Sequence, residues 1–422
     1  MANLAARFSS KVRELLSIPG PGVVTGASDD DPSGIATYSV TGAQTGYSLL
    51  WTSIFSLPLN AAVQNMCARI GLVTGRGLAD ALERRNRRGT LLVLVSLLLV
   101  ANTANIGADI AAVASGLELL TGVPDGVSLV PIGIAIALSE IVIPYRIFAA
   151  YLKVLTLVLF AYIVDALVAG PDWSRALQRS LLPSIHFDTN FITTIVALFG
   201  TTISPYLFFW QTSEEVEELH QHHKQLGTEP DVRRSQFDVD TGMLLAHVVA
   251  YFIILTTATS LFPEGIREIA TAREAAEALR PLAGDQATVL FAIGFVGTGL
   301  LAIPVLAGSA AYAVAEVFDW REGLDEKLRA APQFYTVIAL ATLVGLVIGV
   351  TKVGAIRALF AAAVINGVIT PILIWAILLV SNDADIVGSH RNSLLSNLLG
   401  YTTVAVMGLA AIGMAVSFVL GA

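Results

Sequence analysis

The sequence predicts an all-α protein that crosses a membrane many times. Of its 422 residues, 55% are hydrophobic and only 14% are charged, whereas a soluble domain carries about 25% charged residues. Apolar runs such as residues 90–121 exceed the roughly 20 residues that a helix needs to cross a bilayer. The mean hydropathy of +0.71 agrees with this class.

Eleven membrane helices are expected, and the segment 1–21 precedes them. The lysines and arginines, including those of the run 84–88, lie mainly on the side of the N-terminus. Because positive loops remain in the cytoplasm, we expect the N-terminus in the cytoplasm and the C-terminus outside a cell membrane. The run 84–88 is therefore a topology signal, and no nucleic-acid partner is expected. The expected spans are 22–43, 47–70, 90–121, 127–142, 146–169, 191–213, 239–262, 286–316, 333–350, 356–380 and 398–420.

The first and sixth spans are irregular. The first contains "DDDPSG" (29–34) and the sixth contains "GTTISPY" (200–206). A proline inside an apolar helix removes a backbone donor and clashes with the preceding turn, so each helix should unwind there. Unwound backbone at membrane depth is tolerated where it lines a cavity inside the protein. Two such breaks fit two inverted five-helix halves, 22–169 and 191–380, with a binding site between the breaks and 398–420 as an extra helix.

The three aspartates at the first break are the leading site candidates. An acid within the membrane costs a few kcal/mol even on lenient scales, and a bound cation would compensate this cost. Asp31 directly precedes the helix-breaking Pro32. Asp29 and Asp30 allow a second interpretation, in which they lie at an aqueous mouth and cap the next half-helix.

These residues resemble a known family. The stretch 20–82, with "GAQTGYSLLW" (42–51) and "TGRGLADAL" (74–82), is similar to the opening of NRAMP divalent-metal transporters. The resemblance implies a LeuT/APC-like fold of two inverted five-helix repeats plus an eleventh helix, alternating access, a divalent metal as substrate, and no enzyme activity or cofactor. The bilayer would be its other partner, with no obligate protein partner evident.

Departures from the family pattern point to a different metal preference. The family motif Asp-Pro-Gly-Asn corresponds to Asp-Pro-Ser-Gly at residues 31–34 of this chain, so Gly34 stands in place of the asparagine ligand. Ser204 stands in place of the family's metal-binding methionine. Thr201 stands where the family offers a backbone carbonyl. Thioether sulfur favours soft transition metals, whereas an all-oxygen site with small residues leaves room for the waters that Mg²⁺ retains. The pattern resembles NRAMP-related magnesium transporters, and Mn²⁺ should also pass. The candidate metal ligands are Asp31, Ser204, Thr201, Asp30, Gly34 and Asp29.

The family's proton path is also altered. Where the family has two histidines after the proline of the sixth span, this chain has Tyr206 and Gln211. Where the family has an Asp-x-x-Glu pair in the third span, this chain has Asp109 and Ala112, so the glutamate is absent. We therefore expect uncoupled transport, because moving two charges inward at 100 mV already contributes about 4.6 kcal/mol. Asp109 and His247 could still carry protons, or could be ordinary buried residues.

Several alternatives stay open at the sequence level. Asn366 and Asn105 could line the ion path, or could form interhelical hydrogen bonds as buried amides commonly do. A proton-coupled Mn²⁺/Fe²⁺ symporter is the main alternative function, and an amino-acid transporter on the same fold is a remote one. An intramembrane aspartyl protease is disfavoured, because "NIGAD" (105–109) lacks the usual Gly-x-Gly-Asp context.

Overall fold

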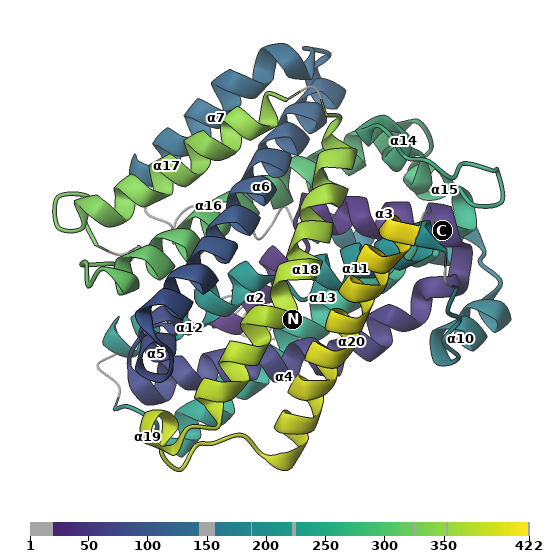
Figure 1. The fold of residues 1–422 in the computed structure, drawn as a ribbon. Coiled ribbons are helices and arrows are strands. Elements are labelled where there is room, and N and C mark those ends of the chain that lie inside the picture. The colour runs from purple at the N-terminus through teal and green to yellow at the C-terminus, as the bar shows by residue number, and fades with distance from the viewer. Residues whose placement is uncertain are drawn as a thin grey trace, which may run out of the picture.

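The computed structural model describes residues 20–142, 157–186, 188–221, 225–324, 326–351 and 353–420. Within these ranges every regular element is a helix (Figure 1), which confirms the predicted all-α class. Short 3₁₀ turns occupy Gly46–Leu49, Leu157–Phe160, Glu277–Leu279 and Gly284–Gln286. The α-helices are α2 (Pro21–Asp29), α3 (Pro32–Thr45), α4 (Leu50–Thr74), α5 (Leu78–Arg85), α6 (Arg88–Thr121), α7 (Asp125–Val142), α9 (Ala161–Ala169), α10 (Trp173–Leu181), α11 (Thr189–Thr202), α12 (Pro205–Gln221), α13 (Glu229–Ser260), α14 (Ala272–Ala276), α15 (Arg280–Ala283), α16 (Ala287–Val317), α17 (Pro332–Gly349), α18 (Ala355–Ser381), α19 (Ala384–Val387) and α20 (Leu394–Leu420).

The helices match the predicted membrane spans closely. Eight helical stretches among the described residues are long and apolar enough to cross a membrane. The first predicted span is divided between α2 and α3, and the sixth between α11 and α12, as the two prolines predicted. The fifth predicted span, 146–169, lies partly outside the described residues, and 157–169 of it is helical. Most of the segment 1–21 also lies outside them.

Close backbone contacts hold the broken helices in the centre of the bundle. A Cβ on Gly26 of α2 would lie 2.3 Å from the carbonyl oxygen of Gly242 on α13. A Cβ on Gly200 of α11 would lie 2.1 Å from the carbonyl oxygen of Ala363 on α18. Only glycine permits these approaches, which is the usual way in which small residues pack membrane helices. The two breaks are thereby held against intact helices on either side.

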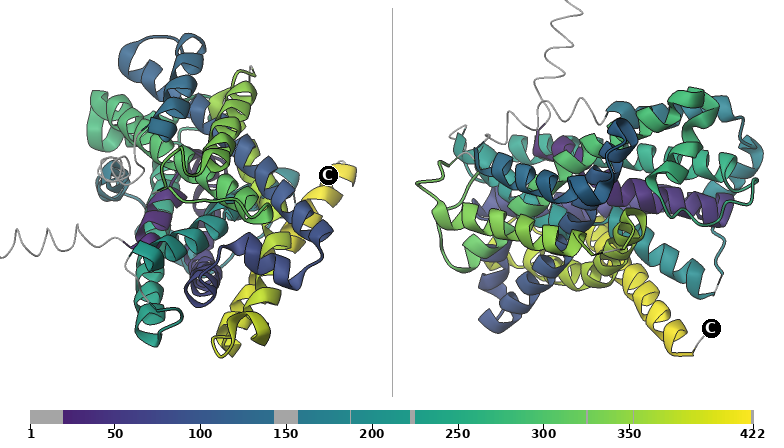
Figure 2. Two further views of the ribbon diagram at one scale, coloured as in Figure 1. Left: turned by 90° about the vertical axis from the view of Figure 1, so that its left-hand side faces the viewer. Right: turned by 90° about the horizontal axis from the view of Figure 1, so that it is seen from above.

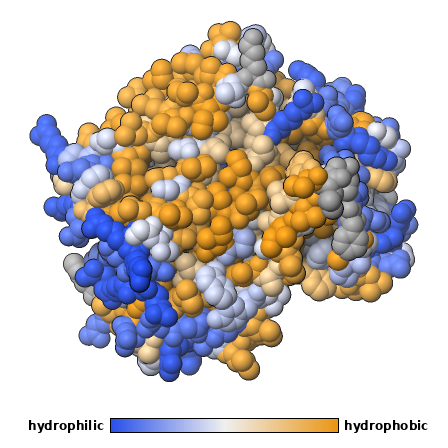
Figure 3. Space-filling model, in the orientation of Figure 1, coloured by the Kyte–Doolittle hydropathy of each residue, from blue (hydrophilic) through white to orange (hydrophobic). Residues whose placement is uncertain are grey.

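The outer helices present an apolar surface. Only 22% of the apolar window of α7 and of α20 is buried, compared with 83% of that of 189–221. Exposed side chains such as Leu138, Val347 and Leu409 suit contact with lipid. Figure 3 shows apolar residues gathered across the middle of one face, with polar residues toward its margins. Helices α7 and α17 pack side by side, and α20 stands at the edge of the bundle (Figure 2).

Candidate functional site

The two helix breaks lie at the centre of the candidate site. Helix α2 ends at Asp29 and α3 begins at Pro32, while α11 ends at Thr202 and α12 begins at Pro205. Proline suits the first helical position, because its missing N–H would have no partner there in any case. Each break exposes carbonyl groups at the end of one half-helix and N–H groups at the start of the next.

Asp31 occupies the turn between α2 and α3 and is almost fully buried. It is the N-cap of α3, and its Oδ1 accepts hydrogen bonds from the Gly34 N–H and the Ser33 hydroxyl, each at 2.7 Å. Its Oδ2 accepts a hydrogen bond from the Asn105 amide on α6 at 2.9 Å. Asn105, which the sequence suggested could line the ion path, therefore lies directly against Asp31.

A chain of hydroxyl groups joins Asp31 to the second break. The Thr201 and Ser33 hydroxyls lie 3.0 Å apart. Because the single proton of the Ser33 hydroxyl goes to Asp31, Thr201 is the donor to Ser33. Ser204 donates to the carbonyl oxygens of Thr201 at 2.8 Å and Gly200 at 3.0 Å. Thr201 and Ser204 thus retain only oxygen lone pairs to offer a ligand.

Asp29 and Asp30 are buried beside the first break, 1% and 5% exposed. This burial argues against the interpretation that they lie at an aqueous mouth. Neither caps α3, since the N-cap of that helix is Asp31. The Oδ1 atoms of both residues are buried without a hydrogen-bond partner.

The space beside Gly34 is smaller than expected. A Cβ on this residue would lie 3.2 Å from both the Asp29 carbonyl oxygen and Cε2 of Tyr38. The expected room for a hydrated ion at this position is therefore not open in this conformation. A side chain there would require its neighbours to shift by a few tenths of an ångström.

Tyr206 and Gln211 bridge α12 to α2. The Tyr206 hydroxyl donates to the Ser28 carbonyl oxygen at 2.7 Å. Gln211 accepts a hydrogen bond from the Thr25 hydroxyl at 2.6 Å and donates to Glu215 at 3.0 Å. The two residues that stand where the family has histidines therefore hold the first half-helix against the second broken helix.

The remaining candidates are buried on other helices. Both carboxylate oxygens of Asp109 on α6 lack a hydrogen-bond partner, although the side chain is fully buried. The side-chain amide nitrogen of Asn366 on α18 also lacks one. The Thr370 hydroxyl donates to the backbone carbonyl oxygens of Asn366 and of Ile203 at the second break. His247 contacts the Met243 carbonyl oxygen at 2.8 Å and is a buried core residue.

Asn60 on α4 is a site residue that the sequence analysis did not identify. Its amide donates to the Thr202 carbonyl oxygen at 2.8 Å and makes a long contact of 3.5 Å to Oδ2 of Asp29. The pair Asn60 and Gln64 places two amides one turn apart in an apolar span. Polar residues within the membrane usually mark a substrate path, and that signal could have identified Asn60.

The donor set at the breaks consists of oxygen and amide groups. The hydrogen-bond partners of Asp31, Thr201 and Ser204 in the described part of the chain include no sulfur and no imidazole. No three His, Cys, Asp or Glu side chains among the described residues are arranged to enclose a metal ion on their own. A cation at this site would therefore need carbonyl, hydroxyl, amide or water oxygens besides its carboxylate ligands.

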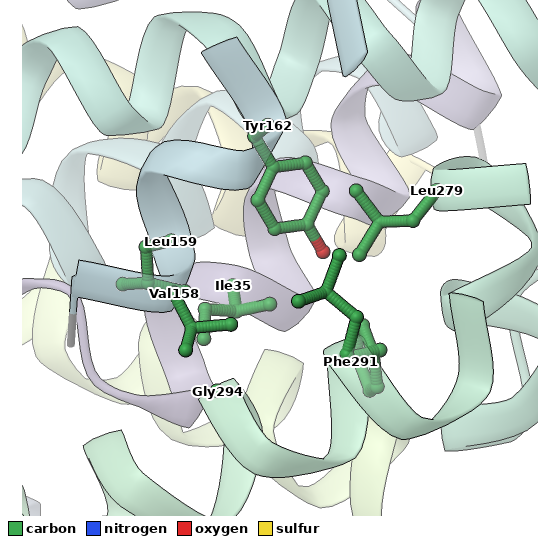
Figure 4. A pocket seen from close by; sticks show the side chains of 8 residues that line it. Ile35, Val158, Leu159, Tyr162, Leu279, Phe291 and Gly294 are labelled. Atoms are coloured by element: carbon green, nitrogen blue, oxygen red, sulfur yellow. The ribbon is translucent and has the colours of Figure 1, made fainter. Parts of the chain in front are cut away.

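A pocket beside α3 is separate from this donor set. Figure 4 shows Ile35, Leu159, Leu279 and Phe291 around it, with the Tyr162 ring pointing inward. The lining is almost entirely apolar. None of the predicted site residues lines this pocket, and among its lining residues only Tyr162 has a polar side chain.

Comparisons of sequence identify a family. The model of the Nramp family, described as "Natural resistance-associated macrophage protein-like", matches residues 22–417. A divalent metal cation transporter MntH of Mesorhizobium japonicum is 27% identical over 68% of this chain and 64% of its own length. The MntH protein of Aeromonas hydrophila is 25% identical over 94% of this chain and 95% of its own length.

Comparisons of structure identify the fold. A variant of the manganese transporter of Eremococcus coleocola superimposes with a TM-score of 0.76, at 20% identity, over 96% of this chain and 88% of that one. A nucleobase-cation-symport-1 family transporter superimposes with a TM-score of 0.58, at 13% identity, over 94% and 92% of the two chains. The predicted LeuT/APC-like fold is thereby confirmed.

Proposed function

The chain belongs to the Nramp family of metal-ion transporters, which are not enzymes, and we propose that it moves Mg²⁺, and also Mn²⁺, across a cell membrane as an uncoupled facilitator. The ion passes by alternating access between the two broken helices, and it keeps part of its water shell. The N-terminus lies in the cytoplasm and the C-terminus outside.

The composition of the donor set is the observation that carries this proposal. Around Asp31 the described contacts are made by hydroxyl, amide and backbone groups, and none by sulfur. At the second break, Ser204 contributes an oxygen where the family resemblance implies a methionine. Oxygen ligands suit Mg²⁺ and Mn²⁺, whereas thioether ligands favour softer ions.

The contacts of Tyr206 and Gln211 support uncoupled transport. The Tyr206 hydroxyl donates to a backbone carbonyl of α2, and Gln211 bridges Thr25 and Glu215. Neither side chain takes up and releases protons near neutral pH as a histidine does. The inward gradient of the ion and the membrane potential then provide the driving force.

A proton-coupled Mn²⁺/Fe²⁺ symporter remains the second candidate, because of one observation. Asp109 is fully buried, and neither of its oxygens has a hydrogen-bond partner. An intramembrane acid of this kind often belongs to a proton relay. The relatives named above as manganese and divalent-metal transporters are also consistent with this candidate.

Reconstitution into liposomes separates the two candidates. Purified protein would be tested side by side with Mg²⁺, Mn²⁺ and Ca²⁺, using ion-sensitive dyes and a pH dye inside the vesicles. Empty liposomes and liposomes with Asp31→Asn serve as controls. Saturable Mg²⁺ influx without acidification supports the proposal. Influx of Mn²⁺ but not Mg²⁺, with matching acidification, would replace it with the symporter.

A further inference from the structure

Asp31 has little remaining capacity to bind an ion in this conformation. Its two oxygens accept hydrogen bonds from Gly34, Ser33 and Asn105 at 2.7–2.9 Å. It also lies at the N-terminal end of α3, where the helix dipole is positive and disfavours a cation. Asp31 therefore serves first to hold the break in shape.

Free oxygens are found instead on the other side of the break. Asp29 is the last residue of α2 and Asp30 is its C-cap. The C-terminal end of a helix carries a partial negative charge, which favours a cation. Both residues are almost fully buried, and the Oδ1 atom of each lacks a hydrogen-bond partner.

Asn60 places an amide group beside Asp29 from α4. The side chain is fully buried, and its Oδ1 also lacks a partner. Its amide nitrogen binds the Thr202 carbonyl oxygen and lies 3.5 Å from Oδ2 of Asp29, so the amide group is held between the two breaks. Carboxylate and amide oxygens are ligands that Mg²⁺ and Mn²⁺ accept, with water in the other positions.

The charge at this place also requires compensation. Among the described residues, no lysine or arginine forms a hydrogen bond with Asp29, Asp30 or Asp31. Isolated buried charges are strongly unfavourable unless they are paired, coordinate a metal or are neutralised by a proton. A divalent ion beside Asp29 and Asp30 would neutralise both carboxylates.

From these contacts we infer that Asp29, Asp30 and Asn60 form a second cation subsite, separate from Asp31, which binds a partly hydrated divalent ion at the C-terminal end of α2. This inference rests on the proposed function and adds a second station to its ion path. Asn60 supplies the amide oxygen that Gly34 cannot supply.

Binding of Mn²⁺ alone to the purified full-length chain tests this subsite. Electron paramagnetic resonance would measure the concentration of free Mn²⁺ as Mn²⁺ is titrated into the protein. With Asp31→Asn, one saturable site should remain, weakened by less than about 100-fold. Adding Asn60→Ala should weaken it by at least a further tenfold or so, and adding Asp29→Asn with Asp30→Asn should remove saturable binding.

Asn102→Ala in the Asp31→Asn background is the matched control. Asn102 is an equally buried asparagine whose amide donates to a backbone carbonyl, that of Leu306, at 2.9 Å. It should leave the remaining Mn²⁺ affinity unchanged within about twofold. Asn60→Asp offers a second variant of the same size, and its added carboxylate should tighten Mn²⁺ binding.

Two results would overturn the subsite. The first is that the wild-type protein binds Mn²⁺ whereas the Asp31→Asn variant shows no saturable Mn²⁺ binding. The other is an Asn60→Ala effect no larger than that of Asn102→Ala, or weaker binding in Asn60→Asp. Wild type that neither binds nor transports Mn²⁺ or Mg²⁺ would instead refute the proposed function itself, so the two failures are distinguishable.

Discussion

Replacing Asp31 should separate its role in folding from its role in transport. Asp31→Asn keeps an oxygen that can accept from Gly34 and Ser33, and the Asn105 amide can turn to present its oxygen. The variant should therefore fold, while the charge that attracts the ion is lost. A lost charge-assisted contact is worth about 1.5–3 kcal/mol, which corresponds to a loss of affinity of roughly 10- to 100-fold.

Asp31→Ala should fold less well than Asp31→Asn. Losing an N-cap costs about 1 kcal/mol. The alanine variant also leaves the Gly34 N–H and the Asn105 amide without their acceptor, and each buried donor left unpaired costs about 1–3 kcal/mol. Relief of the buried charge offsets only part of this.

The assay has two readouts for each variant. Mg²⁺ influx into proteoliposomes measures transport, and thermal unfolding in detergent measures stability. Both variants should lose Mg²⁺ influx, and Asp31→Ala should unfold at a lower temperature than Asp31→Asn. Near-normal influx in Asp31→Asn would refute the site assignment. Equal unfolding temperatures for the two variants would refute the capping role.

Further outcomes follow from the same contacts. Asn86→Cys should stay unlabelled by an impermeant reagent applied outside intact cells, and external labelling would reverse the assigned topology. Influx of Mg²⁺ should leave the internal pH of liposomes unchanged, whereas acidification that disappears in Asp109→Asn would establish proton coupling. Tyr206→Phe loses a hydrogen bond to α2 worth about 1 kcal/mol, so it should open the cytoplasmic side about fivefold more often, measured in inverted vesicles as faster labelling of a cysteine at the half-buried Ala27 of α2. Ser204→Met with Gly34→Asn should raise Cd²⁺ binding and lower Mg²⁺ influx; unchanged selectivity would show that these positions do not set it.

The prolines explain why the breaks could be predicted. A proline acts on its own backbone and on the preceding turn, so Pro32 and Pro205 mark each break from local sequence alone. The aspartate before Pro32 is also a local signal, because Asp is a favoured N-cap. Long apolar helices similarly follow from apolar runs read one segment at a time, and eight stretches of the described residues are of this kind where eleven spans were expected.

Contacts between distant segments could not be predicted in the same way. Asn105 reaches Asp31 from 74 residues away, and Asn60 reaches Thr202 from 142 residues away. These pairings depend on how the helices pack, which glycines such as Gly26 and Gly200 determine through backbone approach. The tight space at Gly34 likewise depends on Tyr38 and on the carbonyl of Asp29, and composition alone does not reveal it.

Three consecutive aspartates are explained by the opposite polarity of the two helix ends that meet at the first break. The positive end of α3 is best served by an acceptor that stays in place, and Asp31 is its cap. The negative end of α2 attracts a cation, and it carries the two carboxylates with buried free oxygens. A single aspartate could not do both, because Oδ1 of Asp31 caps α3 and its Oδ2 already accepts from Asn105. Under the proposed function the ion path needs no soft ligand at either end, so an oxygen at Ser204 in place of the family's methionine suits the hard ions proposed as substrates.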